Sequence, residues 1–171
     1  MAAIGSSPGR NVALLMASAT PLASARFSEL RLPPVPAVVG AYRRCVRSGD
    51  LVYVAGQMPV DERGQPILGV VGKDVTVERA ADAAESAFRR ALAVLREELG
   101  SLEAIERFVR VQVFVRSGPE FTDHPAVANG ATRLIERFWG PGALPARTAV
   151  GAPSLPRGIC VEVDVVAQVR A

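Results

Sequence analysis

The sequence contains few of the residue types that usually hold metals or attack substrates. Its 171 residues include one histidine, His124, and two cysteines, Cys45 and Cys160. A zinc site needs several histidine or cysteine ligands at fixed spacing, and because these are missing we expect no metal. A nucleophilic triad would have to use His124, and the sequence places no nucleophile near it. The cysteines form no CxxC motif and fall in strand-like runs, which predicts two buried thiols.

Lysine, aromatic residues and long apolar runs are also scarce. Lys73 is the only lysine, the net charge is +3, and aromatic residues make up 5% of the chain. Arginine supplies nearly all the positive charge and can bind carboxylate or phosphate. The chain lacks the basic stripe and the stacking aromatics of a nucleic-acid binder, and no apolar run is long enough to cross a bilayer. We therefore expect a cytoplasmic protein with neither a nucleic-acid nor a membrane partner.

The first 26 residues differ in composition from the rest. They are rich in alanine and serine, and Arg10 followed by a short apolar patch at 12–17 is similar to a secretory signal. Polar residues and a proline interrupt the region, so the alternatives are a disordered extension and a true start at Met16. We predict a disordered tail over 1–26 and a single domain over 27–171, because 49% hydrophobic residues suit one core.

Apolar periodicity predicts two amphipathic helices. Over 76–100 apolar residues recur at helical spacing on one side, and Gly100 is placed to end the helix. A second helix is expected over 124–140. Its apolar stripe consists of Val127, Ala131, Leu134, Ile135 and Phe138.

Alternation of apolar and polar residues predicts the strands. Residues 41–58 indicate two strands around a turn at Ser48-Gly49-Asp50, and further strands are expected at 107–116, 146–152 and 158–170. The order β-β-α-β-α-β-β predicts an α+β fold, with one mixed sheet whose valine face is covered by two helices.

The sheet face opposite the helices has a mixed composition. In the strand at 107–116 the alternate valines, from Val109 to Val115, are expected to face the core. The opposite face is expected to carry Phe108, Arg110, Gln112, Phe114, Glu162, Asp164 and Val166. This set is too apolar for free solvent and too polar for a core, which predicts a subunit interface and a homo-oligomer.

Two charged residues near the C-terminus are candidate functional groups. Arg147 follows a glycine- and proline-rich turn at the start of a strand, where its guanidinium can bind a carboxylate in a two-point fork. The alternative is a structural salt bridge with Glu162 or Asp164. Glu162 alternates with valines, so its carboxylate leaves on the non-core face, where it can act as a base or hold a water molecule. The alternative for Glu162 is an interface ion pair.

Two positions near the first strands can border a ligand. Gly56 lies at a strand end, where a glycine lets a ligand approach the backbone or forms a bulge. Tyr42 is expected to begin the first strand and carries a polar tip, although such a tyrosine can also cap a core.

Three segments taken together carry a family resemblance: "VVGAYRRCVRSGDLVYVAGQMPVDERG", "VQVFVRSGPEF" and "LPARTAVGAPSLPRGICVEVDVVA". Over about residues 33–169 the chain resembles the RidA/YjgF family of enamine/imine deaminases, which is also named for L-PSP endoribonuclease. The resemblance implies a chorismate-mutase-like fold and a homotrimer with a cleft between subunits. It also implies hydrolysis of reactive 2-enamine or 2-imine acids to 2-keto acids and ammonia, with no cofactor.

The resemblance also implies roles for single residues. Arg147 matches the arginine that holds the substrate carboxylate, and Glu162 matches the glutamate that positions the attacking water. Tyr42 lines the cleft, Gly56 approaches the substrate through its backbone, and Asn129 matches a family asparagine. Departures from the family pattern are Ala149, where a substrate-binding Cys or Thr is usual, Ala55, where Ser is common, and "GAYRRC" in place of "GPYSQA".

The resemblance leaves three functions to compare. The first is the deaminase reaction, and the second is non-catalytic binding of a small carboxylate metabolite by the trimer. The third is RNA cleavage, which the scarcity of stacking aromatics places last.

Overall fold

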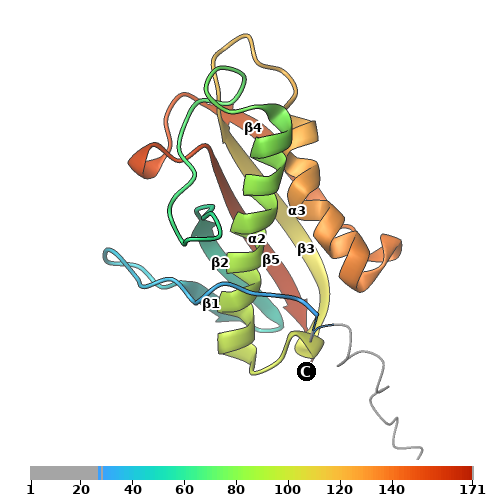
Figure 1. The fold of residues 1–171 in the computed structure, drawn as a ribbon. Coiled ribbons are helices and arrows are strands. Elements are labelled where there is room, and N and C mark those ends of the chain that lie inside the picture. Colours follow the sequence, from blue (N-terminus) through green and yellow to red (C-terminus); the bar gives the residue numbers. More distant parts are fainter. Residues whose placement is uncertain (1–26, 28, 171) are drawn as a thin grey trace, which may run out of the picture.

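The structure is a computed structural model that describes residues 27 and 29–170, and it consists of a five-stranded sheet with two helices on one face (Figure 1). The strands are β1 (Cys45–Ser48), β2 (Leu51–Gln57), β3 (Ile105–Arg116), β4 (Ala146–Ala152) and β5 (Val161–Val169), and the helices are α2 (Val77–Leu99) and α3 (His124–Trp139). The α+β architecture and the order of elements confirm the prediction. The predicted tail over 1–26, with its signal-like patch, lies outside the described residues.

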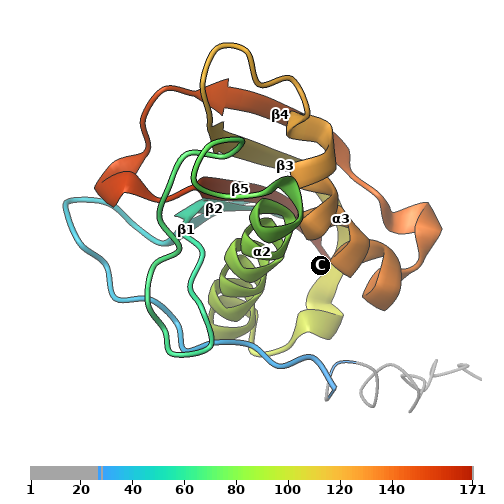
Figure 2. The same cartoon turned by 45° about the horizontal axis from the view of Figure 1, so that its top comes forward.

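The connection through α3 decides where β4 lies. The strand order is β1-β2-β5-β3-β4, and β4 runs parallel to β3 whereas the other pairs are antiparallel. A parallel pair needs a crossover, and α3 provides it. Figure 2 shows α3 beside α2 on the helix-bearing side of the sheet. The crossover brings β4, an edge strand, close to the polar residues of α3.

Local chemistry sets the ends of α2. The Oγ1 of Thr76 accepts a hydrogen bond from the backbone N–H of Arg79 at 3.2 Å, which caps the start of the helix. Gly100 follows the last turn with φ 77°, a conformation that favours glycine, and confirms the predicted stop. Between these ends the alanines are small enough for α3 to pack closely against α2.

The valines of β3 and β5 form the core beneath the helices. Those at alternate positions of 111–115 are fully buried, as predicted. The prediction for the first half of β3 is wrong, because Phe108 is 2% exposed and Val109 is 38% exposed. Val109 is the extra residue of a bulge against β5, and a single extra residue reverses the alternation of faces. Phe108 therefore makes edge-on ring contacts with Phe88 and Trp139, at 5.3 and 4.9 Å between centroids.

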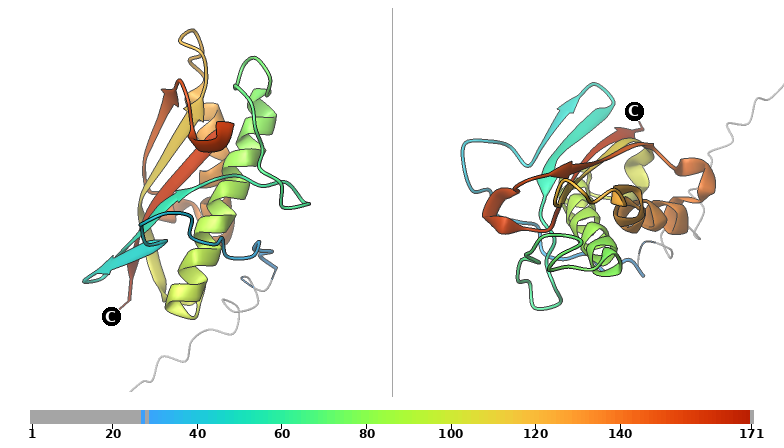
Figure 3. Two further views of the ribbon diagram at one scale, coloured as in Figure 1. Left: turned by 90° about the vertical axis from the view of Figure 1, so that its left-hand side faces the viewer. Right: turned by 90° about the horizontal axis from the view of Figure 1, so that it is seen from above.

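No helix of the described residues covers the other face of the sheet (Figure 3). Gln112 pairs with Asp164 across β3 and β5, and Glu162 shares the face of Asp164, as predicted. Toward the β1 edge, Val46 and Tyr53 form a cross-strand pair and are 51% and 47% exposed. We call this surface the open face; it combines exposed apolar groups with half-buried carboxylates.

Two smaller predictions need correction. Tyr42 does not begin the first strand: β1 starts at Cys45, and Tyr42 lies in the preceding bend with half of its surface exposed. Cys160 is buried as expected, but Cys45 is only half-buried and its thiol donates a hydrogen bond to Glu98 at 3.5 Å. Burial raises the pKa of the Cys45 thiol to about 11, and the charge of Glu98 adds to the effect.

Neither α2 nor α3 is both long and apolar enough to cross a membrane, and the same holds for every helix among the described residues. This result agrees with the absence of long apolar runs in the sequence.

The contact between α2 and α3 yields a test of the packing. A Cβ added at Gly130 of α3 would collide with the backbone carbonyl of Ala81 on α2. Alanine normally stabilises a helix relative to glycine by about 1 kcal/mol. We expect Gly130→Ala to lower the free energy of unfolding by about 1–3 kcal/mol instead, because the two backbones must separate. Urea denaturation measures the change.

The matched control is Gly142→Ala, since a Cβ there meets no atom within 4 Å and the backbone is not in the left-handed region. Its free energy of unfolding should stay within about 0.5 kcal/mol of the parent value. Equal stability of the two variants would contradict the close helix contact.

Candidate functional site

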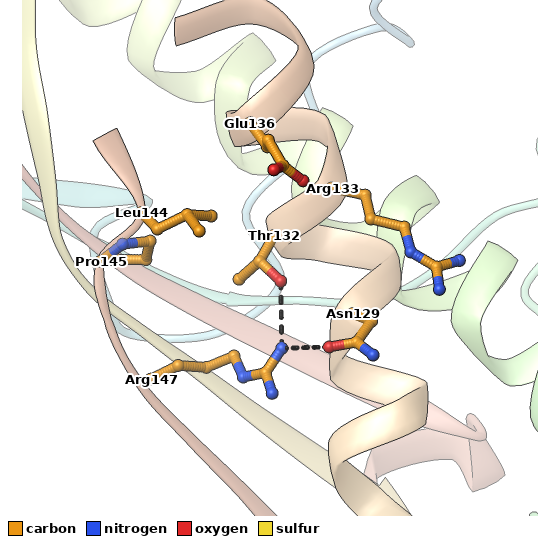
Figure 4. Close-up of a pocket in the computed structure, with 7 residues that line it drawn as sticks. All are labelled: Asn129, Thr132, Arg133, Glu136, Leu144, Pro145 and Arg147. Atoms are coloured by element: carbon orange, nitrogen blue, oxygen red, sulfur yellow. Dashed lines mark hydrogen bonds between the residues drawn. The ribbon is translucent and has the colours of Figure 1, made fainter. Parts of the chain in front are cut away.

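Arg147 reaches from the start of β4 to the adjacent face of α3 (Figure 4). Its Nη1 donates hydrogen bonds to the Oδ1 of Asn129 at 2.8 Å and to the Oγ1 of Thr132 at 3.0 Å. Asn129 and Thr132 are three residues apart on the helix, so they lie on the same face one turn apart. The two neutral side chains hold Nη1 of the guanidinium, and its other donors have no hydrogen bond to any of the described residues.

Within the described part of one chain, Arg147 forms no structural salt bridge. Glu162 and Asp164 form no ion pair with it, and no carboxylate of the described residues lies within 4.0 Å of its guanidinium nitrogens. An arginine stays charged in proteins and has five N–H donors. The positive charge of Arg147 is therefore positioned by neutral acceptors and is free to bind an anion.

A pocket of about 420 Å³ opens in front of this guanidinium, a volume that suits a small metabolite. Its lining residues are Asn129, Thr132, Arg133, Glu136, Leu144, Pro145 and Arg147 (Figure 4). Thr132 was not among the residues predicted from sequence. Its spacing of three from Asn129 on a predicted helix is the signal that would have revealed it.

Glu162 and Gly56 meet on the open face. Val54 pairs with Val165 and Gln57 pairs with Val163, so β2 has one extra residue opposite β5 at this point. The bulge brings the backbone of Gly56 against the carboxylate of Glu162, with which a Cβ at Gly56 would collide. The prediction that Gly56 forms a bulge is confirmed, and the absence of a side chain at Gly56 leaves room for the Glu162 carboxylate.

The environment of Glu162 disfavours its charged form. Burial raises the pKa of this carboxyl above the usual glutamate value, and the nearby charge of Asp164 raises it further. Burial also raises the pKa of Asp164, although the charge of Arg110 and a hydrogen bond with the backbone of Gln112 oppose the rise. A carboxylate with a raised pKa accepts a proton more readily, which is the property required of a base that works near neutral pH.

Arg147 and Glu162 do not meet within one chain. Arg147 pairs with Val111 and points to the helix side, whereas Glu162 pairs with Phe114 and lies on the open face. They are also separated by two strand spacings, about 10 Å, and by about 10 Å along the strands. The expectation of a joint anion site therefore requires a second copy of the chain.

The remaining predicted residues are distributed between these two places. Asn129 contacts Arg147 directly. Ala149 follows Arg147 by two residues, so it shares the helix side of β4 and packs against the core. Tyr42 lies in the bend before β1, where it contacts neither Arg147 nor Glu162 through any hydrogen bond of the described residues.

The prediction that His124 has no nucleophile nearby is wrong. The Nε2 of His124 lies 3.2 Å from the Oγ of Ser117, within hydrogen-bond distance. Gly151 of β4 packs on the pair, because a Cβ there would lie 2.7 Å from the histidine nitrogen and 3.0 Å from the serine oxygen. Ser117 directly follows β3 and His124 begins α3, so the pair joins these two elements. The Ser117 side of the pair is buried, with 9% of the residue exposed. The seven-residue loop between them conceals this contact in the sequence.

Known proteins are similar to this chain in sequence and in fold. The family described as endoribonuclease L-PSP matches residues 34–169. Protein TCP17 of Trypanosoma cruzi is 34% identical over 91% of this chain and 98% of its own length. The 2-iminobutanoate/2-iminopropanoate deaminase of Dermatophagoides farinae is 29% identical over 77% of this chain and 88% of its own length. The structure of Atu1372 from Agrobacterium tumefaciens, a protein of unknown function, is 36% identical, with a TM-score of 0.77 over 86% of this chain and 94% of that chain.

The mixed sheet with two helices on one face is the fold that this chain shares with the Atu1372 structure. The chain belongs to the endoribonuclease L-PSP family, the RidA/YjgF family that its motifs resemble.

The raised pKa of Glu162 has a consequence for stability. Because the folded state holds this proton more tightly than the unfolded chain, stability falls as pH rises from the unfolded pKa through the folded pKa. We expect Glu162→Gln to raise the free energy of unfolding at pH 7. This gain should disappear below pH 4.5, the ordinary glutamate value, where Glu162 is protonated in both states. Denaturation at a series of pH values measures the difference.

Glu120→Gln, at an exposed loop position, controls for the loss of one negative charge. Its free energy of unfolding at pH 7 should stay within about 0.5 kcal/mol of the parent value. A Glu162→Gln effect that does not depend on pH would contradict the assignment of a desolvated carboxylate.

Proposed function

We propose that the protein hydrolyses reactive 2-enamine or 2-imine acids to 2-keto acids and ammonia. The observation that carries the proposal is the Arg147 guanidinium, which neutral partners hold at the mouth of a pocket without a carboxylate of its own. A relative at 29% identity named 2-iminobutanoate/2-iminopropanoate deaminase supports this choice of reaction.

Arg147 binds the substrate carboxylate in this proposal. Its unused N–H donors form a planar fork that matches the two oxygens of a carboxylate. Asn129 and Thr132 fix the guanidinium orientation, so the fork is in place before the substrate arrives. The pocket beside it has room for the short side chain of an amino-acid-derived imine.

Glu162 activates the water. The substrate reacts as the protonated imine. The Glu162 carboxylate accepts a proton from a water molecule whose oxygen bonds to the imine carbon, the carbon–nitrogen π electrons move to the nitrogen, and a neutral tetrahedral carbinolamine forms. Glu162 then gives this proton to the amino nitrogen, and the carbon–nitrogen bond breaks with its electron pair leaving on ammonia. The hydroxyl proton passes to Glu162 as the carbonyl of the keto acid forms, and it leaves on ammonia as ammonium. The raised pKa of Glu162 suits both halves of this exchange. No redox step occurs and no cofactor is consumed.

The active assembly is a homotrimer in this proposal, with Arg147 and Glu162 meeting across a contact between copies. Their positions on opposite faces of one sheet support an intersubunit cleft. The exposed apolar pair Val46 and Tyr53 supports association through the open face.

Ala149 favours a second candidate, a trimer that binds a small carboxylate without turnover. The methyl group at this position offers no hydrogen bond to a substrate beside Arg147. A binder would be stabilised by its ligand through Arg147 alone, by about 2.7 kcal/mol at a ligand concentration of one hundred times Kd.

Substitution of Arg147 tests the deaminase proposal. We expect Arg147→Gln to lower kcat/KM about 100-fold or more for release of pyruvate or 2-ketobutyrate from a freshly generated imine, because a desolvated carboxylate loses its charged partner. Keto-acid formation measured immediately after imine generation gives the rate.

Arg96→Gln removes an arginine from the exposed side of α2, away from both Arg147 and the open face, and it should keep full activity. Equal rates of the parent chain and Arg147→Gln would refute the deaminase role for this site. Carboxylate-dependent stabilisation that requires Arg147, in a protein without turnover, would instead identify the binder.

A charge on the open face tests the assembly. We expect Tyr53→Glu to dissociate the trimer, because an unpaired carboxylate would be buried at the contact. Light scattering should change from three times the 18.0 kDa chain mass to a single chain. Arg96→Glu places the same charge on the exposed side of α2 and should leave the mass unchanged. A parent chain that is already monomeric, or a Tyr53→Glu trimer, would contradict this interface.

A further inference from the structure

A larger cleft lies on the side of α2 away from Arg147. Its volume is about 990 Å³, within the range of small-molecule sites. Its walls are the proline-rich segment 31–36, the loop 60–64, and α2 at Ser86, Arg89 and Arg90. Figure 2 shows the loop that contains 60–64 on the side of α2 opposite α3.

The walls of this cleft are held in place by hydrogen bonds. Arg89 uses its Nη1 to donate to the carbonyl of Arg31 at 2.9 Å, and its other donors bind Glu85. The hydroxyl of Ser86 donates to the carbonyl of Val60 at 2.6 Å and accepts from the N–H of the same residue at 3.0 Å. Both the proline-rich segment and the loop are therefore fixed to α2, and the cleft is preformed.

Arg90 is the exception among these arginines. Its Nε is buried and has no hydrogen-bond partner, and no ion pair reaches its guanidinium from the described residues. Burial lowers the pKa of Arg90, and the Tyr42 phenol only partly opposes this. Arg116 also has an unpaired Nε, but its Nη1 donates to the carbonyl of Gly158 at 3.0 Å. The described part of the chain thus offers no group that compensates the half-buried charge of Arg90, and such a charge is costly unless a ligand supplies one.

We propose that this cleft binds a small organic anion with one carboxylate and an apolar body, and that Arg90 is its principal anion contact. The guanidinium fits a carboxylate in two-point geometry. The prolines of 31–36, with Leu32 and Val35, provide apolar surface for the rest of the ligand. Three carboxylates, those of Glu29, Asp61 and Glu62, also line the cleft, and their charges disfavour dianions and phosphate more than a single carboxylate.

The site is independent of the proposed deaminase pocket. Arg90 lies on α2 and lines the larger cleft together with the proline-rich segment. Arg147 lies on β4 and lines the other pocket together with residues of α3. A ligand in the larger cleft would therefore bind whether or not Arg147 is intact.

Benzoate is the probe, because it combines one carboxylate with an apolar ring. The binding is followed on the full chain by NMR, through the Nε–H resonance of Arg90, and by thermal denaturation. The titration is repeated in the Arg147→Gln background, since the Arg147 pocket also accepts carboxylates. We expect benzoate binding to persist there and to weaken about 10- to 100-fold in Arg90→Gln, the loss expected for a charge-assisted hydrogen bond.

Two further variants and two further ligands test whether benzoate binding depends on the Arg90 guanidinium. Arg96→Gln removes an exposed arginine from the same helix and should bind benzoate as the parent does. Arg90→Lys keeps the charge without the planar fork and should show an intermediate loss of benzoate affinity. If Arg90→Gln fails to fold, the loss in Arg90→Lys tests the proposal in its place. Benzyl alcohol has the ring without the charge, and acetate has the charge without the ring, so both should bind more weakly.

The proposal is overturned by unchanged benzoate affinity in Arg90→Gln, or by binding that disappears in Arg147→Gln. It is equally overturned if benzyl alcohol matches benzoate, or if the Arg90 resonance does not move at benzoate concentrations well above about 1 mM.

Discussion

The close approach of α2 and α3 at Gly130 determines where the positive charge of the site lies. At Gly130 the backbone of α3 comes so near the carbonyl of Ala81 that no side chain fits between them. This contact fixes the height and rotation of α3 over the β3–β4 edge. Asn129, the residue before Gly130, is thereby aimed at β4, and Thr132 follows one turn later. The orientation of the Arg147 guanidinium thus depends on helix packing rather than on its own strand.

The period-two alternation of the strands could be predicted from the sequence wherever the strands pair without interruption. The valines at 111–115 and the carboxylates at 162 and 164 lie on the predicted faces for this reason. Two predictions were wrong, one about the sheet face that Val109 occupies and one about where the first strand begins. Val109 is a bulge residue, and Tyr42 precedes a strand shorter than its apolar pattern indicates. Bulges depend on register against a partner strand, and a single sequence does not specify that register.

The partners of the arginines were beyond prediction for a related reason. In the sequence Arg89, Arg90 and Arg147 are equivalent charges, and only the fold distinguishes them. Arg89 is neutralised by Glu85 one turn earlier, which helical spacing alone indicates. Arg147 is held by neutral groups from a different element, and Arg90 has no hydrogen-bond or ion-pair partner among the described residues. Contacts between distant segments, and the places where such contacts are missing, come from tertiary packing.

The opposite faces occupied by Arg147 and Glu162 bear on the proposed role of Glu162 as a base at neutral pH. In a single chain burial and Asp164 both raise the pKa of Glu162. Association through the open face would remove more water and raise it further, which by itself would keep the group protonated. A neighbouring copy that brings Arg147 to the same cleft would oppose this rise with its charge. The proposed assembly therefore supplies both the desolvation and the compensating cation, and the balance between them sets the proton affinity of the base.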